Sequence, residues 1–286
     1  MQRTACASLF ALLLAATAAA QEAVQIKIDK PQVGDRVKHS REEKSDTKIT
    51  ITVGGMDQKK DEAKTKTLVY VEEVLAVPEG ADRATKLTRT YEKAQITSEG
   101  KSRKLDVEGK TVLIEKKGDK FDFTVEGKAV EGESLTMLQS EFNKEGKEEP
   151  RDLMLPKQPV KPGETWKIDA ARLTKNLGDN FSVDKDKLEA TGKLVKTYKK
   201  DGKQFGVIDL KVSAPITGLG EKSPVKVKDG SMVVTMAGDG CIDGTSAEGK
   251  STMVMKFTVE GGVQGADLKV DATVTENRTS APLPKK

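Results

Sequence analysis

Nucleophilic catalysis is the first chemistry to consider, because it needs a serine or cysteine placed beside a base. His39 is the only histidine of the chain and lies in the polar segment Val37–Ser40, where we expect a solvated imidazole. The segment Gly244–Gly249 has one residue too many for the Gly-x-Ser-x-Gly motif of serine hydrolases. The sequence therefore predicts a protein that is not an enzyme. Paired carboxylates are the one catalytic arrangement that it leaves open.

Metal and nucleotide sites also lack their usual residue patterns. Asp239–Gly244 aligns with the start of an EF-hand loop, but Lys250 stands at the twelfth position, where a bidentate glutamate is needed. We expect an acidic hairpin loop there. The pairs Gly218-x-Gly220 and Gly238-x-Gly240 lack the third glycine of a dinucleotide-binding motif. The sequence thus indicates no metal and no cofactor.

Methionines gather on two segments that alternate like neighbouring strands. Methionine is flexible and fills irregular spaces, so it suits both cores and surfaces that adapt to apolar ligands. The favoured interpretation is an ordinary core. The alternative is an apolar groove for a lipid-like molecule, completed by the inner faces of residues 188–212 and 265–275. The residues concerned are Met232, Met236, Met253, Met255 and Phe257.

The first 20 residues have the pattern of a secretory signal peptide. Arg3 precedes the apolar run Ala5–Ala16, and Ala18–Ala20 supplies small residues before the cleavage point. A membrane anchor is the alternative, but Ala5–Ala20 is shorter than the ~20 residues that cross a bilayer. We therefore predict an exported protein, periplasmic or extracellular, with no transmembrane span after cleavage.

Cysteine and charge content narrow the class of protein further. Cys6 would leave with the signal peptide, so Cys241 has no internal disulfide partner, and we expect it to be buried and inert. Because Arg3 is the one charged residue of that segment, 48 of the 49 basic residues and all 45 acidic ones remain. Such a balance does not favour a nucleic-acid partner.

Alternation of apolar and polar residues dominates the rest of the chain and predicts half-buried strands. It starts with Val24–Ile28. Two hairpins are expected, one spanning 111–125 and one spanning 188–212 across an Asp-Gly turn. We expect the polar segment Gly54–Lys66 to be a loop.

Helical patterns are few. Ser134 is a candidate N-cap for an amphipathic helix over 134–143, and Asp169 can cap a second helix that stops at Gly178. The sequence therefore predicts a mainly β fold, with antiparallel sheets in two halves, half-barrel or sandwich-like, and one or two short helices.

A proline-rich strap, Leu155–Trp166, organises the chain. Proline fixes its own φ and disfavours helix before it, so the strap must be extended. We expect Trp166, the only tryptophan, to pin the strap onto the sheet, and assign structural roles to Pro159, Pro162, Gly163 and Trp166. The expected divisions are a signal peptide (1–20), two β-rich halves (21–149 and 150–279) and a disordered tail (280–286).

Two proline-bearing turns hint at an internal duplication. Pro31–Val37 resembles Val160–Trp166, since each has Gly followed by an acid and then a strand start. Two β-domains that use the same turn chemistry would look alike without common descent.

The strap also carries a resemblance. Its Pro-Val-x-Pro-Gly-Glu-Thr-Trp motif and the following Asp-Gly hairpin resemble exported bacterial β-rich proteins of unknown function, over residues 155–212. The resemblance implies an envelope location and supplies no active-site residues. We expect a non-enzymatic envelope or periplasmic binding protein for a lipid-like apolar ligand. The rival is a structural or protein-interaction module of the envelope, whose partner would be another envelope protein at an exposed sheet edge or face.

Overall fold

A computed structural model of the chain describes residues 22–143, 153–177, 181–220 and 223–286. The predicted signal peptide and residues 144–152, where we expected the boundary between the halves, lie outside these ranges. Among the described residues, no helix is both long enough and apolar enough to span a bilayer.

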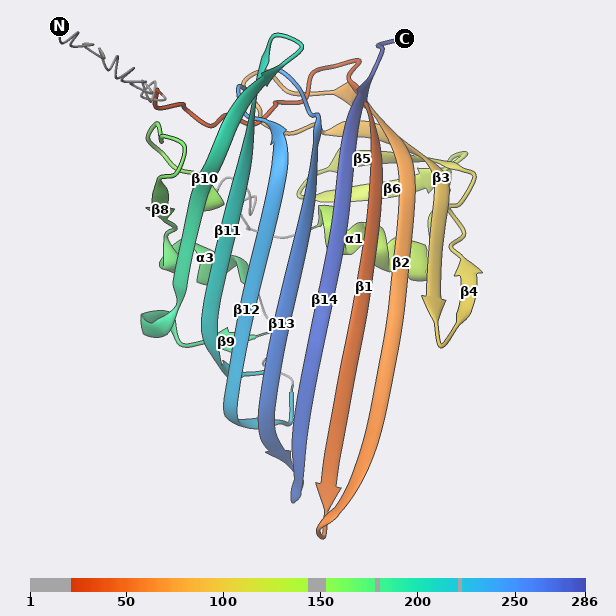
Figure 1. The fold of residues 1–286 in the computed structure, drawn as a ribbon. Helices are drawn as coiled ribbons and strands as arrows, with labels where there is room; N and C mark the ends of the chain where they lie inside the picture. Colours follow the sequence, from red (N-terminus) through yellow and green to blue (C-terminus); the bar gives the residue numbers. More distant parts are fainter. Residues whose placement is uncertain (1–21, 144–152, 178–180, 221–222) are drawn as a thin grey trace, which may run out of the picture.

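One antiparallel sheet of 14 strands forms the body of the protein (Figure 1). Its strand order is β7-β6-β5-β3-β2-β1-β14-β13-β12-β11-β10-β8, with β4 paired to β3 and β9 paired to β11. The strands are β1 (Arg36–Val53), β2 (Met56–Ala76), β3 (Lys86–Ser98), β4 (Lys101–Lys104), β5 (Thr111–Lys117), β6 (Lys120–Val125), β7 (Lys128–Ala129), β8 (Thr165–Lys167), β9 (Ser182–Val183), β10 (Glu189–Lys200), β11 (Lys203–Gly218), β12 (Lys226–Cys241), β13 (Gly249–Val263) and β14 (Ala266–Leu283).

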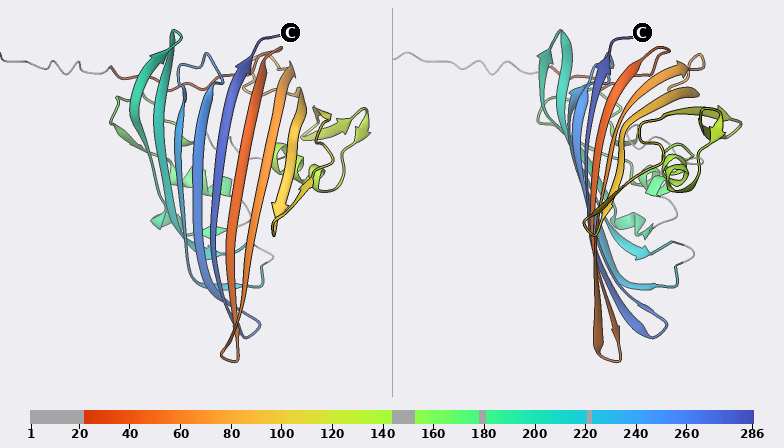
Figure 2. Two further views of the ribbon diagram at one scale, coloured as in Figure 1. Left: turned by 45° about the vertical axis from the view of Figure 1, so that its right-hand side comes forward. Right: turned by 90° about the vertical axis from the view of Figure 1, so that its right-hand side faces the viewer.

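The predicted mainly β fold is confirmed, and the sheet is open rather than closed. β1 and β14 pair with each other at its middle, so the N-terminal strands lie on one side of this pair and the C-terminal strands on the other. The sheet curves around two helices, α1 (Gly132–Phe142) and α3 (Ala170–Leu177), which lie on its concave side (Figure 2). We call this side the inner face. The half-barrel expectation therefore describes the architecture well.

Tight turns explain why consecutive strands pair so regularly. The two-residue turn Asp201-Gly202 has positive φ at both positions, and so has Gly54-Gly55. Such turns match the natural twist of paired strands. The predicted hairpins are confirmed as β5–β6 and β10–β11.

The expected loop over Gly54–Lys66 is wrong. The chain turns at Gly54-Gly55, and β2 begins at Met56 and pairs with β1 from Met56 to Glu73. The sequence of this strand shows no alternation of apolar and polar residues near the turn, because both of its faces are exposed there. The expected strand at Val24–Ile28 is also wrong, since this segment makes only single bridges, Val24 to Val160 and Lys27 to Asp243.

The sequence prediction misplaces the start of helix α1 and the beginning of the tail, and it places the N-cap of α3 correctly. Helix α1 begins at Gly132 with Glu131 as its N-cap, so Ser134 lies inside the helix and is buried rather than capping it. Asp169 does cap α3, because its carboxylate accepts hydrogen bonds from the backbone N–H groups of Ala171 (2.9 Å) and Arg172 (3.2 Å). The expected disordered tail is wrong at 280–283, where β14 continues to Leu283 and pairs with Arg36.

Two main cores lie on the inner face, one in each half of the sheet. The N-terminal core gathers around Leu68, Tyr91 and Leu138, the last of these from α1. The C-terminal core gathers around Trp166, Leu194 and other residues of the strap, α3 and β10–β12. A smaller core holds Ile216, Met232 and Val259. Each half of the sheet thus buries its own apolar face.

Trp166 pins the strap as predicted. The indole lies against Gly192 of β10, where an added Cβ would be 2.2 Å from the ring. Its Nε1–H donates to the backbone carbonyl of Met154 at 2.8 Å. Gly163 has a φ of +89°, which favours glycine, and the two prolines before it, Pro159 and Pro162, belong to the non-helical strap.

The two turns that resemble each other in sequence share their hydrogen bonds. The Asp35 carboxylate accepts from Gln32 N (2.6 Å), as the Glu164 carboxylate accepts from Lys161 N (2.7 Å). Each turn also bonds to a neighbouring strand through the glycine N–H and the carbonyl of the acidic residue: Gly34 and Asp35 pair with Val74, and Gly163 and Glu164 with Leu194. The same turn therefore starts β1 and β8.

Candidate ligand-binding cavity

A cavity of about 520 Å³ lies on the inner face. Its floor comes from β11–β14, β1 and β2, and two non-strand segments, around Ile26–Ile28 and Met154–Leu155, line part of its partly open sides. The first of these segments is fixed by Lys27 N, which donates to the carbonyl of Ile242 at 2.8 Å, and by the bridge between Val24 and Val160. The cavity therefore belongs to the framework of the sheet and its coverings.

Small residues hollow out the floor. Gly206, Gly240 and Gly249 stand opposite one another on β11, β12 and β13, and Ser280 of β14 continues the row. Gly238 lies in the next row, between Ile208 and Ser251. Since glycine has no side chain, these strands line the cavity mostly with backbone. The floor is hollow because small residues, glycine and serine, occupy positions in two adjacent rows of the sheet.

The walls of the cavity are mainly apolar. They come mainly from β11, β12 and the two covering segments, and most of these residues belong to the C-terminal core or pack against it. The apolar lining residues include Ile26, Ile28, Met154, Leu155, Ile208, Leu210, Met236 and Ile242.

One side of the cavity is polar and includes His39, Glu72 and Arg278. The solvated imidazole expected for His39 is wrong, because its ring packs on Tyr70 with 5.1 Å between centroids. Burial lowers the pKa of His39, which the nearby Glu72 partly offsets. At neutral pH the imidazole is therefore uncharged and contributes a flat, weakly polar surface.

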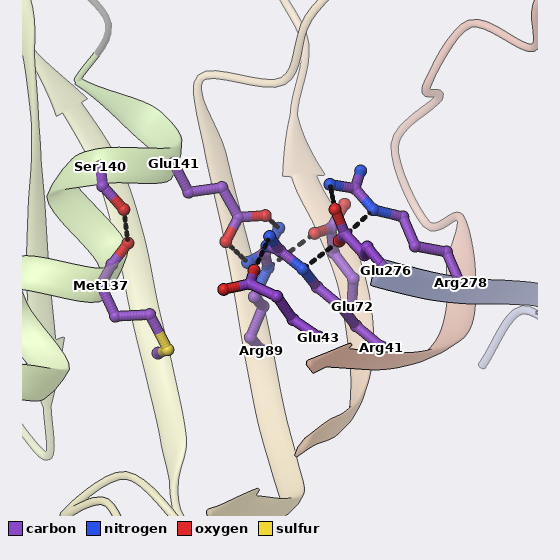
Figure 3. A network of polar contacts seen from close by, with 9 residues as sticks. All are labelled: Arg41, Glu43, Glu72, Arg89, Met137, Ser140, Glu141, Glu276 and Arg278. Atoms are coloured by element: carbon purple, nitrogen blue, oxygen red, sulfur yellow. Dashed lines mark hydrogen bonds and ion pairs between the residues drawn. The ribbon is translucent and has the colours of Figure 1, made fainter. Parts of the chain in front are cut away.

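Beside this polar side, a charged network crosses the middle of the inner face (Figure 3). Its centre is Arg89 of β3, which is 5% exposed. The guanidinium donates to Glu72 at 2.8 Å and to both oxygens of Glu141 at 2.9 and 3.0 Å. It also lies 4.4 Å from the Tyr70 ring centroid and 4.6 Å from that of Phe142. Because Glu141 and Phe142 belong to α1, this contact fastens the helix to the sheet.

The network continues onto the central pair of strands. Glu276 of β14, 3% exposed, accepts from Arg278 and forms an ion pair with Arg41 of β1. Arg41 also donates to Glu43 at 2.8 Å, and Glu43 pairs with Lys66 at 3.1 Å. Each buried carboxylate is thus matched by a cation, as buried charges require. We call these eight residues the charged seam: Arg41, Glu43, Lys66, Glu72, Arg89, Glu141, Glu276 and Arg278.

The seam lowers the pKa of Glu141 and of Glu43. Burial alone would raise the pKa of Glu141, but the Arg89 guanidinium lowers it to about 2. The pKa of Glu43 is likewise lowered, because Lys66 and Arg41 outweigh its burial. Both carboxylates therefore stay ionised at neutral pH and hold their cations in place.

Cys241 lies at the rim of the cavity and is half-buried, so its expected full burial is wrong. Its thiol donates to the Asp243 carboxylate at 3.1 Å, which also accepts from Thr245 N (3.0 Å) and Gln204 N (2.7 Å). These bonds lower the pKa of Asp243. These bonds hold together the acidic loop expected at Asp239–Gly244, which leads from β12 toward β13. No cluster of three metal-ligating side chains occurs in the described part of the chain.

The structure divides the methionine site predicted from sequence. Met236 lines the cavity. Met232 is buried in the small core, where Met255 and Phe257 pack beside it and Phe257 contacts Phe181 with 5.4 Å between ring centroids. Met253 is half-buried and stands between Met236 and Glu276 in the sheet. The five residues share the inner face, yet only one of them belongs to the cavity.

Comparisons with known proteins identify no family for this chain. No family model and no curated protein matches its sequence. Among solved structures, a lipovitellin has 9% identity and a TM-score of 0.37 over 89% of this chain, which spans 26% of that protein. An outer membrane channel from Pseudomonas putida F1 has 8% identity and a TM-score of 0.20, over 89% of this chain and 98% of that one.

A DUF1329 family protein from Desulfovibrio piger ATCC 29098 has 10% identity and a TM-score of 0.15, over 81% of this chain and 83% of that one. These three TM-scores all lie below 0.5, so none of the likenesses indicates a function for this chain.

Proposed function

We propose that this protein is an exported, non-catalytic carrier that binds a lipid-like molecule in the cavity of its inner face. The observation that carries the proposal is the cavity itself, which combines a glycine floor with apolar walls. Its volume of about 520 Å³ falls within the ~300–1,000 Å³ typical of small-molecule sites.

The seam supports a carrier over an enzyme. A carboxylate-based catalyst needs an acid or base that can exchange protons with a substrate. Glu72, Glu141 and Glu276 are instead held by arginine guanidinium groups, which position α1 and the central strands. In the cavity lining, Asp239 accepts a hydrogen bond from the Tyr198 hydroxyl, and Glu248 forms an ion pair with Lys200.

Export and an envelope location remain part of the proposal and rest on the signal-peptide pattern of residues 1–20. Secretion of a reporter fused to these residues, with processing after Ala20, supports this part. Retention of the unprocessed fusion in the cytoplasm contradicts it. The result is independent of whether the cavity binds a ligand.

Gly238 offers a direct test of the cavity. An added Cβ there meets no atom closer than 3.9 Å, so a side chain can start from this position without a clash and point into the cavity that Gly238 lines. We expect Gly238→Leu to fill the cavity and weaken binding of a dansyl-labelled fatty acid at least tenfold. Ala237→Leu is the matched control, because it adds a similar volume at the next residue, which faces away from the inner face.

The measurement is a fluorescence titration of the purified mature protein and both variants. Saturable binding by the parent protein and by Ala237→Leu, with loss in Gly238→Leu, supports the carrier. Absence of saturable binding in the parent protein, or equal binding by all three, contradicts it. Circular dichroism confirms that the variants are folded.

A further inference from the structure

The β1–β2 hairpin ends in a tip without charge. Residues 49–56 contain no charged side chain, although charged residues make up 33% of the chain. The hairpin extends far past β3, and Thr52, opposite Asp267, is the last residue of β1 that pairs with β14, so residues 53–56 form its free end (Figures 1 and 2). Residues 212–220 and 230–238 are also free of charge, but they lie mostly within β11 and β12, whereas this run includes the turn of a hairpin.

The tip exposes two apolar side chains side by side. Val53 is 50% exposed and Met56 is 74% exposed, the highest value among the large apolar residues of the described chain. They are cross-strand partners on either side of Gly54-Gly55, so they lie on the same face. Together they form a compact apolar point at the end of the hairpin.

The apolar surface continues from the tip toward the small core. Ile51 stands opposite Leu268, and Ile49 opposite Val270, all half-buried. Val259 of β13 stands opposite Val270 in the same row and is fully buried. Every residue of this strip shares the inner face with the cavity, because the registers of β1, β13 and β14 contain no bulge.

A protein partner fits this tip poorly. A stable protein interface buries about 800 Å² on each side, more than two exposed side chains at a turn can supply. Strand addition is also disfavoured, because the free edge of β2 before Lys64 carries the charged run Lys59–Glu62. The small exposed area and the charged edge therefore favour a partner that can take up two apolar side chains without a large interface.

We propose that the tip formed by Val53, Gly54, Gly55 and Met56 inserts into the surface of a lipid bilayer. A bilayer takes up apolar side chains individually and needs no complementary shape. Behind the tip, three lysines (Lys48, Lys59, Lys60) are balanced by three acids (Asp57, Asp61, Glu62), and Lys60 forms an ion pair with Glu62. Insertion therefore does not depend on anionic lipid, and the binding is weak and reversible.

The first test is flotation of the mature protein with phosphatidylcholine vesicles. We expect the double variant Val53→Asp/Met56→Asp to reduce the vesicle-bound fraction at least tenfold. Val33→Asp is the matched control, because Val33 is 59% exposed and lies in the turn at the opposite end of β1. It should bind vesicles like the parent protein.

A gain of binding gives a second readout. Tryptophan favours the membrane interface, so Met56→Trp should bind vesicles more tightly, and its added fluorescence should shift to shorter wavelength with vesicles. The native Trp166 is buried in the strap and serves as a constant background.

Three results overturn the membrane contact. One is equal flotation of the parent protein and the double variant, or no flotation at all. Another is binding that requires anionic lipid and disappears at high salt. The third is a dimer, seen by analytical ultracentrifugation, that the double variant abolishes. Fatty-acid binding in solution should be unchanged in the double variant, which separates a failure here from a failure of the carrier proposal.

Discussion

Replacing Arg89 by methionine tests whether the charged seam stabilises the fold. Methionine keeps most of the side-chain length between the Tyr70 and Phe142 rings but removes the guanidinium. Glu72 and Glu141 then lose the cation that bonds to both. Breaking a buried ion pair on one side costs about 3–5 kcal/mol. Since the two carboxylates are 23% and 29% exposed, water can reach them, which favours the lower end, about 3 kcal/mol.

The pKa of Glu141 leads to a similar magnitude. Its pKa falls from 4.5 to about 2 on folding, and each unit of difference corresponds to about 1.4 kcal/mol. The seam therefore contributes about 3 kcal/mol through this carboxyl group. Because the pKa is lower in the folded state, the contribution is complete above about pH 4.5 and is lost as the pH falls toward 2.

The assay is urea unfolding of the parent protein and Arg89→Met at pH 7 and at pH 3. We expect a deficit of about 3 kcal/mol at pH 7, or a fall of roughly 6–12 °C in the melting temperature, and a smaller deficit at pH 3. Arg103→Met is the control, because the Arg103–Glu133 pair is exposed and such pairs contribute less than about 1 kcal/mol. A deficit below about 1 kcal/mol at pH 7, or an equal deficit at both pH values, would refute the reasoning.

Two further substitutions test how local contacts fix the strap and α3. Gly192→Ala should destabilise the protein by about 2 kcal/mol, because its Cβ would lie 2.2 Å from the Trp166 ring. In thermal unfolding, the outward-facing control Thr191→Ala should change stability by only about 0.5 kcal/mol, and equal effects would contradict the packing argument. Asp169→Ala should cost about 1 kcal/mol through loss of the α3 N-cap. Urea unfolding measures it, and an unchanged midpoint would show that the cap is not needed.

The fold class could be predicted because the strands of this protein carry local information. Alternation and the Asp-Gly turn define β10 and β11 without any knowledge of their neighbours. The N-terminal part of β2 could not be found in this way. Near its turn both faces of that hairpin meet water, so Lys59, Lys60 and Asp61 alternate with nothing apolar. Pairing with β1, rather than burial, defines this strand.

The charged seam could not be predicted from the sequence for a related reason. In β1 the residues Arg41–Lys44 are all charged, so the pattern does not show which of them point inward. Arg41 and Glu43 do so, because β14 places Arg278 opposite Arg41 and Glu276 opposite Glu43, on the inner face. The sequence nevertheless contains a signal, because each of the two central strands, β1 and β14, carries an arginine and a glutamate two residues apart. Two such pairs on one face can neutralise each other when the strands are neighbours.

The glycines of the cavity show the limit of motif reading. In the sequence, Gly238 and Gly240 lack the third glycine of a dinucleotide-binding motif. Their contribution appears only in the sheet, where Gly206 and Gly249 flank Gly240 on both sides. Three glycines from three strands make a hollow that no linear motif contains.

The same pairing of charges leads to a prediction about the ligand. The cavity reaches the seam at Arg278, whose Nε and Nη2 already donate to Glu276. An anionic headgroup would therefore meet a guanidinium whose charge is already neutralised by this carboxylate, which is 3% exposed. We therefore expect a dansyl-labelled fatty acid and its uncharged methyl ester to bind within about threefold of each other, since apolar contacts supply most of the affinity. Competition titrations at neutral pH compare the two. A preference of more than tenfold for the acid would mean that a cation of the seam is released to bind the ligand. Arg278→Gln should then abolish that preference.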